Sequence, residues 1–127
     1  MAEITLNGDI VHTVGKLPVP GTEAKNFTLT DSNLNDVTLK DFIGKKIILN
    51  IFPSIDTPTC ATSIRTFNEN AAKLDNTVVL GISRDLPFAH QRFCGAEGIE
   101  NVITLSEMRD INFGKDYGIK INDGPLE

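Results

Sequence analysis

Two cysteines, Cys60 and Cys94, are the residues of this 127-residue chain best suited to covalent chemistry. Cys60 follows a strand-like run and a proline-bounded loop, and it stands in the first turn of a predicted helix. A helix N-terminus offers free N–H groups and a partial positive charge, which favour a thiolate, the nucleophilic form of cysteine. Spacing alone leaves Cys60 open between a reactive thiol and a buried structural residue. Taken by itself, Cys94 is better explained as a core residue beside Phe93.

An alternation of strands and helices carries both cysteines. Apolar, β-branched runs predict the strands, and spacings of three and four between apolar residues, or glycines at an end, predict the helices. In order, these are a strand at 46–52, a helix at 59–74, a strand at 77–83, a helix at 87–96, a strand at 102–105 and a helix at 111–117. The order implies βαβ crossovers and a largely parallel sheet. The strand at 46–52 is expected to be central and covered on both faces.

Shorter elements are predicted before this alternation. They are a hairpin over residues 3–14, two strands at 26–30 and 37–39, and a helical turn that stops at Gly44. The hairpin prediction rests on Asn7-Gly8, because both positions of such a turn must adopt a positive φ. The length suits a single α/β domain over residues 1–127. In open α/β sheets ligands bind at the carboxyl ends of the strands, where Cys60 is predicted to lie.

The composition is that of an ordinary globular protein with a mild acidic excess. Hydrophobic residues make up 40% and charged residues 23%, which argues against disorder. The net charge of −5 argues against nucleic acid or an anionic membrane as a partner, since both reward clustered Lys and Arg. No signal peptide is visible, and the longest apolar run, at 47–52, is too short to span a bilayer. We therefore expect a cytoplasmic protein, where structural disulfides are rare.

The segment before Cys60 carries a recognisable motif. Pro53-Ser54-Ile55-Asp56-Thr57-Pro58-Thr59-Cys60 contains Pro-x-x-x-Thr-x-x-Cys and resembles the active-site loop of the peroxiredoxins. Further blocks, at 50–57, 75–80, 92–98 and 123–126, resemble the bacterial thiol peroxidase branch of that family, as does the N-terminal hairpin. The resemblance runs essentially from end to end of the chain. It implies a thioredoxin-like fold with an N-terminal β-hairpin.

The resemblance also implies an activity and its residues. Cys60 would attack hydrogen peroxide or an organic hydroperoxide, Thr57 would align the peroxide, and Pro53 would shield the sulfur from water. Cys94 would resolve the resulting sulfenic acid into a disulfide, and thioredoxin would reduce it. A homodimer is implied, and no metal or cofactor. Without the motif, Thr57 would be better explained as a helix cap.

An active-site arginine of this family is not found in the chain. In the thiol peroxidase branch it follows the Gly-Pro-Leu segment, whereas this sequence ends at Glu127. We therefore expect the chain to be C-terminally incomplete, without the closing strands and last helix. A natural short form is the alternative, with a rate lower by about 10²–10³. Arg65 is interpreted as a helix-face residue and not as that arginine, and Arg84 is equally unassigned.

Three other functions fit these residues less well. A disulfide reductase usually has Cys-x-x-Cys, but the fourth position after Cys60 is Ser63. A metal site would draw on Cys60, Cys94, His12 and His90, which lack Cys-x-x-Cys or His-x-x-x-His spacing. His12 is expected on a strand surface and His90 on a helix face. A redox sensor or partner-binding module could use the same disulfide, but it would oxidise once without cycling. For any such disulfide the two Cα atoms must approach within about 7 Å, so we expect the helix of Cys94 to unwind partly.

Overall fold

The structure, a computed structural model, describes residues 1–110 and 112–126, and these form two compact units. The smaller unit combines residues 1–25 with residues 112–126, and the larger unit is Asn26–Asp110. Both cysteines lie in the larger unit. Within the described ranges, none of the helices has the length and apolar character that a membrane span requires.

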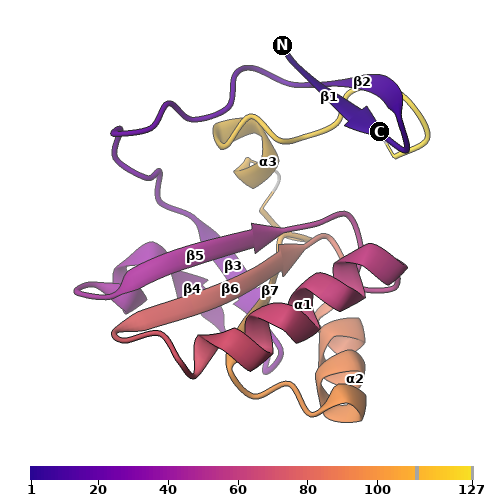
Figure 1. The fold of residues 1–127 in the computed structure, drawn as a ribbon. Coiled ribbons are helices and arrows are strands. Elements are labelled where there is room, and N and C mark those ends of the chain that lie inside the picture. Colours follow the sequence, from indigo (N-terminus) through magenta and orange to yellow (C-terminus); the bar gives the residue numbers. More distant parts are fainter. Residues whose placement is uncertain (111, 127) are drawn as a thin grey trace. The chain divides into compact units, whose positions relative to one another are not determined.

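The larger unit is built on a five-stranded mixed sheet (Figure 1). In spatial order its strands are β4 (Asp36–Thr38), β3 (Thr28–Asp31), β7 (Val102–Ser106), β6 (Thr77–Ser83) and β5 (Lys46–Ile51). Strands β5, β6 and β7 run parallel, whereas β3 is antiparallel to both β4 and β7. The short 3₁₀ helix η1 (Leu39–Phe42) follows β4. The predicted βαβ order is therefore confirmed.

One prediction about the sheet is wrong. Strand β5 was expected to be central, but in the described structure it pairs only with β6 and lies at the edge of the sheet. Its first residue is exposed and the other five are half-buried. A near-continuous apolar run indicates that both faces of a strand are at least partly covered. It carries no information about how many neighbours the strand has, and this explains the error.

Two helices, α1 (Pro58–Ala71) and α2 (Pro87–Glu97), cover the same face of this sheet (Figure 1). They share one hydrophobic cluster with the sheet, formed by Phe52, Ile55, Ala61, Ile64, Val79, Phe93, Ile99 and Val102. Gly81 on β6 lets α1 approach closely, because a Cβ there would lie 2.7 Å from Cδ1 of Ile64. Helix α1 ends before Leu74, which is exposed, so its predicted end was three residues too late.

The ends of α2 follow the predicted pattern. Pro87 is its first residue, where the missing N–H of proline costs no helical hydrogen bond. Gly98 closes the other end with a left-handed φ of +66°, and its N–H donates to the carbonyl of Cys94. Gly95 lies inside the last turn, with open space where a Cβ would stand. Gly95 weakens the last turn of α2, whereas Gly98 stabilises its end, because glycine adopts the left-handed cap without strain.

The smaller unit contains the N-terminal hairpin. Strands β1 (Ala2–Leu6) and β2 (Asp9–Thr13) pair through a turn in which Asn7 and Gly8 both have a positive φ, as predicted. The last predicted helix is observed as the short α3 (Phe113–Asp116), and residue 111 lies outside the described residues. His12 on β2 is not a free surface residue, because its ring and backbone N–H both contact the Asp123 carboxylate at 2.7 Å.

Candidate active site

Cys60 lies at the third position of α1, the helix that follows β5 after the loop at 52–57. It is a free thiol and is half-buried against the hydrophobic cluster. Pro58 and Thr57 precede it, at the first helical position and the N-cap position respectively. The sulfur thus stands in the first turn, beside N–H groups that have no helical partner. This is the placement that the sequence predicted.

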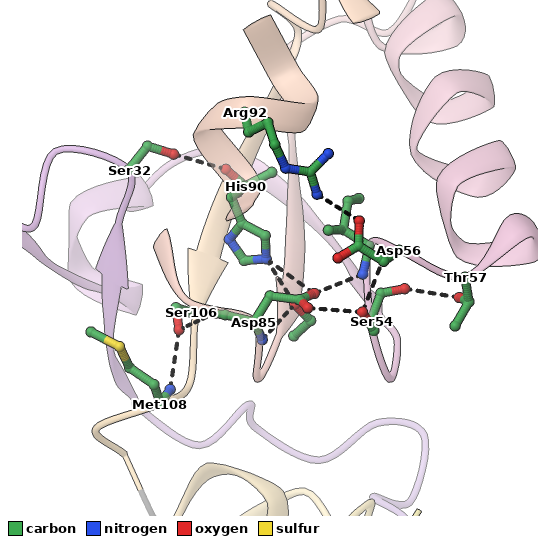
Figure 2. Close-up of polar contacts among 12 residues, drawn as sticks. Ser32, Ser54, Asp56, Thr57, Asp85, His90, Arg92, Ser106 and Met108 are labelled. Atoms are coloured by element: carbon green, nitrogen blue, oxygen red, sulfur yellow. Dashed lines mark hydrogen bonds and ion pairs between the residues drawn. The ribbon is translucent and has the colours of Figure 1, made fainter. Parts of the chain in front are cut away.

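Thr57 occupies the N-cap position, but its hydroxyl does not cap the helix. The hydroxyl instead donates to the backbone carbonyl of Ser54 at 2.8 Å (Figure 2). The N–H of Thr57 donates to the same carbonyl at 3.2 Å. These two bonds close the segment from Ser54 to Thr57 into a compact turn. The hydroxyl oxygen retains lone pairs that can accept a further hydrogen bond. Pro53, at the start of this loop, is exposed.

Cys94 lies on α2 and packs against the same hydrophobic cluster as Cys60. It is also a free thiol and half-buried. Burial raises the pKa of Cys94, and a hydrogen bond with Thr104 only partly offsets this. Cys94 is therefore held as a thiol, the unreactive form, while α2 is folded.

Two ion pairs join α2 to the region of Cys60. Arg65 on α1 donates twice to the Glu97 carboxylate, at 3.0 Å each, and its guanidinium lies 5.6 Å from the ring centroid of Phe93. Arg92 donates to the carboxylate of Asp56 at 2.6 Å. The four charged groups are exposed or partly exposed, so solvent screens both pairs and each contributes little to stability. Arg65 is engaged on the helix face, as predicted.

A hydrogen-bonded network that sequence reasoning missed lies beside the loop (Figure 2). The Asp85 carboxylate accepts from the Ser83 hydroxyl at 2.6 Å, the Ile55 N–H at 2.7 Å and the Ser54 hydroxyl at 2.8 Å. His90 Nε2 lies 2.7 Å from the Ser83 hydroxyl. Burial opposes ionisation of Asp85, but these hydrogen bonds outweigh it, so the pKa of Asp85 is lowered. We call these five residues the Asp85 network.

His90 is fully buried, so the helix face on which it was predicted to lie is the face of α2 that packs into the core. An ionised carboxylate only accepts, so the single proton of the Ser83 hydroxyl is used on Asp85. His90 must then donate to Ser83 through Nε2, and this assigns the neutral tautomer. Pro87, His90 and Phe93 are the buried residues of α2, at a spacing of three. That spacing was present in the sequence and could have placed His90 in the core.

Comparison with known proteins identifies the family. The family model described as Redoxin matches residues 19–127. Thiol peroxidases of Mycobacterium bovis and Mycobacterium tuberculosis are each 56% identical to this chain over 126 residues, which are 99% of this chain and 75% of theirs. The chain belongs to the redoxin family.

Solved structures agree with this assignment. A peroxiredoxin-like protein from Aquifex aeolicus has a TM-score of 0.88 at 33% identity, covering 98% of this redoxin and 72% of that chain. A thiol peroxidase from Chromobacterium violaceum has a TM-score of 0.85 at 22% identity, covering 98% and 73%, and shares the fold. This redoxin is a thiol-dependent peroxidase of the peroxiredoxin type with a thioredoxin-like fold. In the described residues no group of three His, Cys, Asp or Glu side chains could hold a metal ion.

The stability of this redoxin should depend on the protonation of His90. Burial lowers the pKa of His90, and this outweighs the attraction of Asp85 for a protonated ring. The unfolded chain binds the proton near the ordinary histidine value of about 6.5, and the folded protein binds it only at lower pH. The contribution of His90 to the free energy of unfolding is therefore complete above this value and is lost as the pH falls toward the folded-state pKa.

Urea unfolding of wild type and His90→Gln, at about pH 7.5 and about pH 5.5, measures this contribution. Glutamine keeps an N–H for Ser83 but does not titrate, so the variant should lose less stability on acidification. Burial raises the pKa of Glu107, which acts in the opposite direction. The difference between the two proteins in the free energy of unfolding lost on acidification is the contribution of His90. An equal decline in both would show that His90 does not titrate on unfolding as described.

Proposed function

We propose that Cys60 is the peroxidatic residue of this thiol-dependent peroxidase. Its thiolate attacks one oxygen of a hydroperoxide, an S–O bond forms and the O–O bond breaks. The sulfur is oxidised by two electrons to the sulfenic acid, and the leaving oxygen takes a proton to give water or an alcohol. The observation that carries the proposal is the place of Cys60, a half-buried free thiol in the first turn of α1. Substrates are hydrogen peroxide and organic hydroperoxides.

Thr57 and Pro53 are proposed to prepare the peroxide for attack. The Thr57 hydroxyl already donates to the Ser54 carbonyl, so its oxygen is oriented to accept from a peroxide O–H. Holding the peroxide in line with the sulfur removes much of the entropic cost of the reaction. Pro53 begins the same loop and has no N–H with which to attract water. Its ring is proposed to limit water at the sulfur.

Cys94 is proposed to resolve the oxidised enzyme. Its sulfur attacks the Cys60 sulfenic acid, an S–S bond forms, and the S–O bond breaks with release of water. The raised pKa of Cys94 in the folded helix keeps it from competing for peroxide. Unwinding the end of α2 would expose this thiol and let it ionise and reach Cys60. Superposable reduced and oxidised structures would contradict the unwinding.

The disulfide must then be reduced by a dithiol, whose two thiols are oxidised as both cysteines return to thiols. We propose thioredoxin as that dithiol, following the resemblance to thiol peroxidases. On the same ground we propose a cytoplasmic homodimer in which residues 1–127 belong to one domain. The dimer is tested by sedimentation equilibrium of the reduced protein.

Peroxide consumption coupled to thioredoxin and its reductase tests the whole cycle. The expected result is sustained turnover, with an oxidised intermediate whose intact mass is lower by two hydrogen atoms. Mass is the preferred readout, because the chain contains no tryptophan and one tyrosine for fluorescence. A protein that oxidises once and is not recycled would instead be a redox sensor.

The two glycines at the end of α2 provide a matched test of unwinding. Gly98→Ala places a side chain in the left-handed conformation, at a cost of about 1–2 kcal/mol, and should weaken the helix end. Gly95→Ala fills open space inside the helix and should strengthen it by about 0.5–1 kcal/mol. We expect disulfide formation to be faster, up to about tenfold, in Gly98→Ala and about two- to fivefold slower in Gly95→Ala. Quenched-flow mass spectrometry measures the rate of disulfide formation. Equal rates in the two variants would contradict unwinding of α2 as a step of the cycle.

A further inference from the structure

Asp85 contacts the active-site loop through both oxygens of its carboxylate. One carboxylate oxygen accepts from the Ile55 N–H and the Ser83 hydroxyl, and the other accepts from the Ser54 hydroxyl (Figure 2). The backbone carbonyl of Asp85 also accepts from Ser106 at 2.6 Å. The residue therefore connects the ends of β6 and β7 to the segment between Pro53 and Thr57.

Hydrogen bonds within the loop connect Asp85 to the residues that are proposed to react. Ser54 is held through its side chain by Asp85, and its carbonyl accepts from both the hydroxyl and the N–H of Thr57. Its hydroxyl oxygen also accepts from the Asp56 N–H at 3.1 Å. Thr57 in turn accepts the first helical bond, from the Ala61 N–H at 3.0 Å. A continuous path of hydrogen bonds thus runs from Asp85 to the turn that carries Cys60.

The other side of the network reaches the helix of Cys94. Ser83 accepts from His90 Nε2 at 2.7 Å, and His90 lies one turn before Cys94 on α2. His90 has no exposed surface, and its Nδ1 is buried with no hydrogen-bond partner among the described residues. The Asp85 network therefore holds the loop of the first cysteine and the helix of the second in one set of contacts.

We propose that Asp85 is a positioning residue of the peroxidase. Its carboxylate fixes the turn from Ser54 to Thr57, and thereby sets the Thr57 hydroxyl at the place where the peroxide must be held beside the Cys60 sulfur. This inference rests on the proposed roles of Cys60 and Thr57. Asp85 does not touch the reacting atoms, and so it acts on the rate through geometry.

Asp85→Asn is the appropriate change, because it keeps the shape and removes one acceptor. If the amide oxygen continues to accept from Ile55 and Ser83, the amide nitrogen must face the Ser54 hydroxyl. The Ser54 hydroxyl could then no longer donate to residue 85 and would have to accept from the amide instead. The hydrogen bond that holds the loop would therefore change. Misplacement of a reacting group by about 1 Å can cost about 100-fold in rate. We expect the second-order rate constant for oxidation of Cys60 by hydrogen peroxide to fall about 10- to 100-fold.

A second reaction separates positioning from simple loss of structure. Alkylation of Cys60 by iodoacetamide needs the thiolate but no aligned peroxide, so its rate in folded Asp85→Asn should stay within about threefold of wild type. Asp75→Asn makes the same charge change at an exposed turn and should leave both rates unchanged. Each is measured by intact mass on protein whose fold is verified by circular dichroism, with Cys94→Ser as the common background, so that one thiol reacts.

Two outcomes would overturn the inference. One is an unchanged peroxide rate in folded Asp85→Asn, and the other is an equal loss in the peroxide and alkylation rates. If Asp85→Asn does not fold, Ser54→Ala decides, since it keeps the carboxylate and its bond to the Ile55 N–H, and removes only the contacts of the Ser54 hydroxyl with Asp85 and with the Asp56 N–H. We expect at least a threefold lower peroxide rate in Ser54→Ala, and a wild-type rate would overturn the proposal. Peroxidase activity that survives Cys60→Ser would instead contradict the proposed function itself.

Discussion

Replacing Cys60 by serine is expected to reduce peroxide consumption to the rate of buffer alone. A serine hydroxyl has nearly the same size as the thiol, so the half-buried position at the start of α1 stays filled. The hydroxyl, however, is scarcely ionised at neutral pH and is a poor nucleophile toward the O–O bond. The first turn of α1 would then hold the peroxide without a sulfur to receive its oxygen. The coupled thioredoxin assay measures this directly.

Ser63 offers a matched control on the same helix. Its hydroxyl donates to the carbonyl of Cys60 at 2.8 Å and accepts from Asn50. Ser63→Ala removes a neighbouring polar group without touching the thiol, and it should retain turnover within about threefold of wild type. If Cys60→Ser kept the activity of wild type, the assignment of the nucleophile would be wrong, whatever the state of Cys94.

Predictions from the sequence agree with the structure where local conformational rules are strong. Asn7-Gly8 fixed the hairpin because few other dipeptides accept two positive φ values. Proline at the start and glycine at the end bounded α2 within one residue, since both act through the backbone alone. The place of Cys60 followed from the same logic, because a strand, a proline-bounded loop and a helix leave the residue in the first turn.

The features that the sequence did not predict share a different cause. The Asp85 network joins residues that are 30 or 31 positions apart, and no local pattern encodes that a carboxylate after β6 will reach Ser54 and Ile55. The edge position of β5 likewise depends on how the chain crosses the sheet. Tertiary contacts decided each of these cases.

Cys94→Ser should separate the two halves of the catalytic cycle. Cys60 would still react with peroxide at the wild-type rate, because serine preserves the packing of α2 and the folded helix keeps Cys94 as an unreactive thiol in any case. The sulfenic acid would then have no partner within the chain, since the sequence contains only these two cysteines. We expect one equivalent of peroxide to be consumed in a burst, followed by a steady rate near that of buffer.

The same variant should also be damaged by its substrate. With excess peroxide the unresolved sulfenic acid proceeds to the sulfinic acid, and the intact mass should gain two oxygen atoms in total. Wild type under the same conditions should stop at the disulfide, and a non-reducing gel should show it within one chain. The assay must use thioredoxin without added small thiols, because these would reduce the sulfenic acid directly. Sustained turnover of Cys94→Ser would show that the reductant itself resolves Cys60, and the raised pKa of Cys94 would then be a consequence of packing alone.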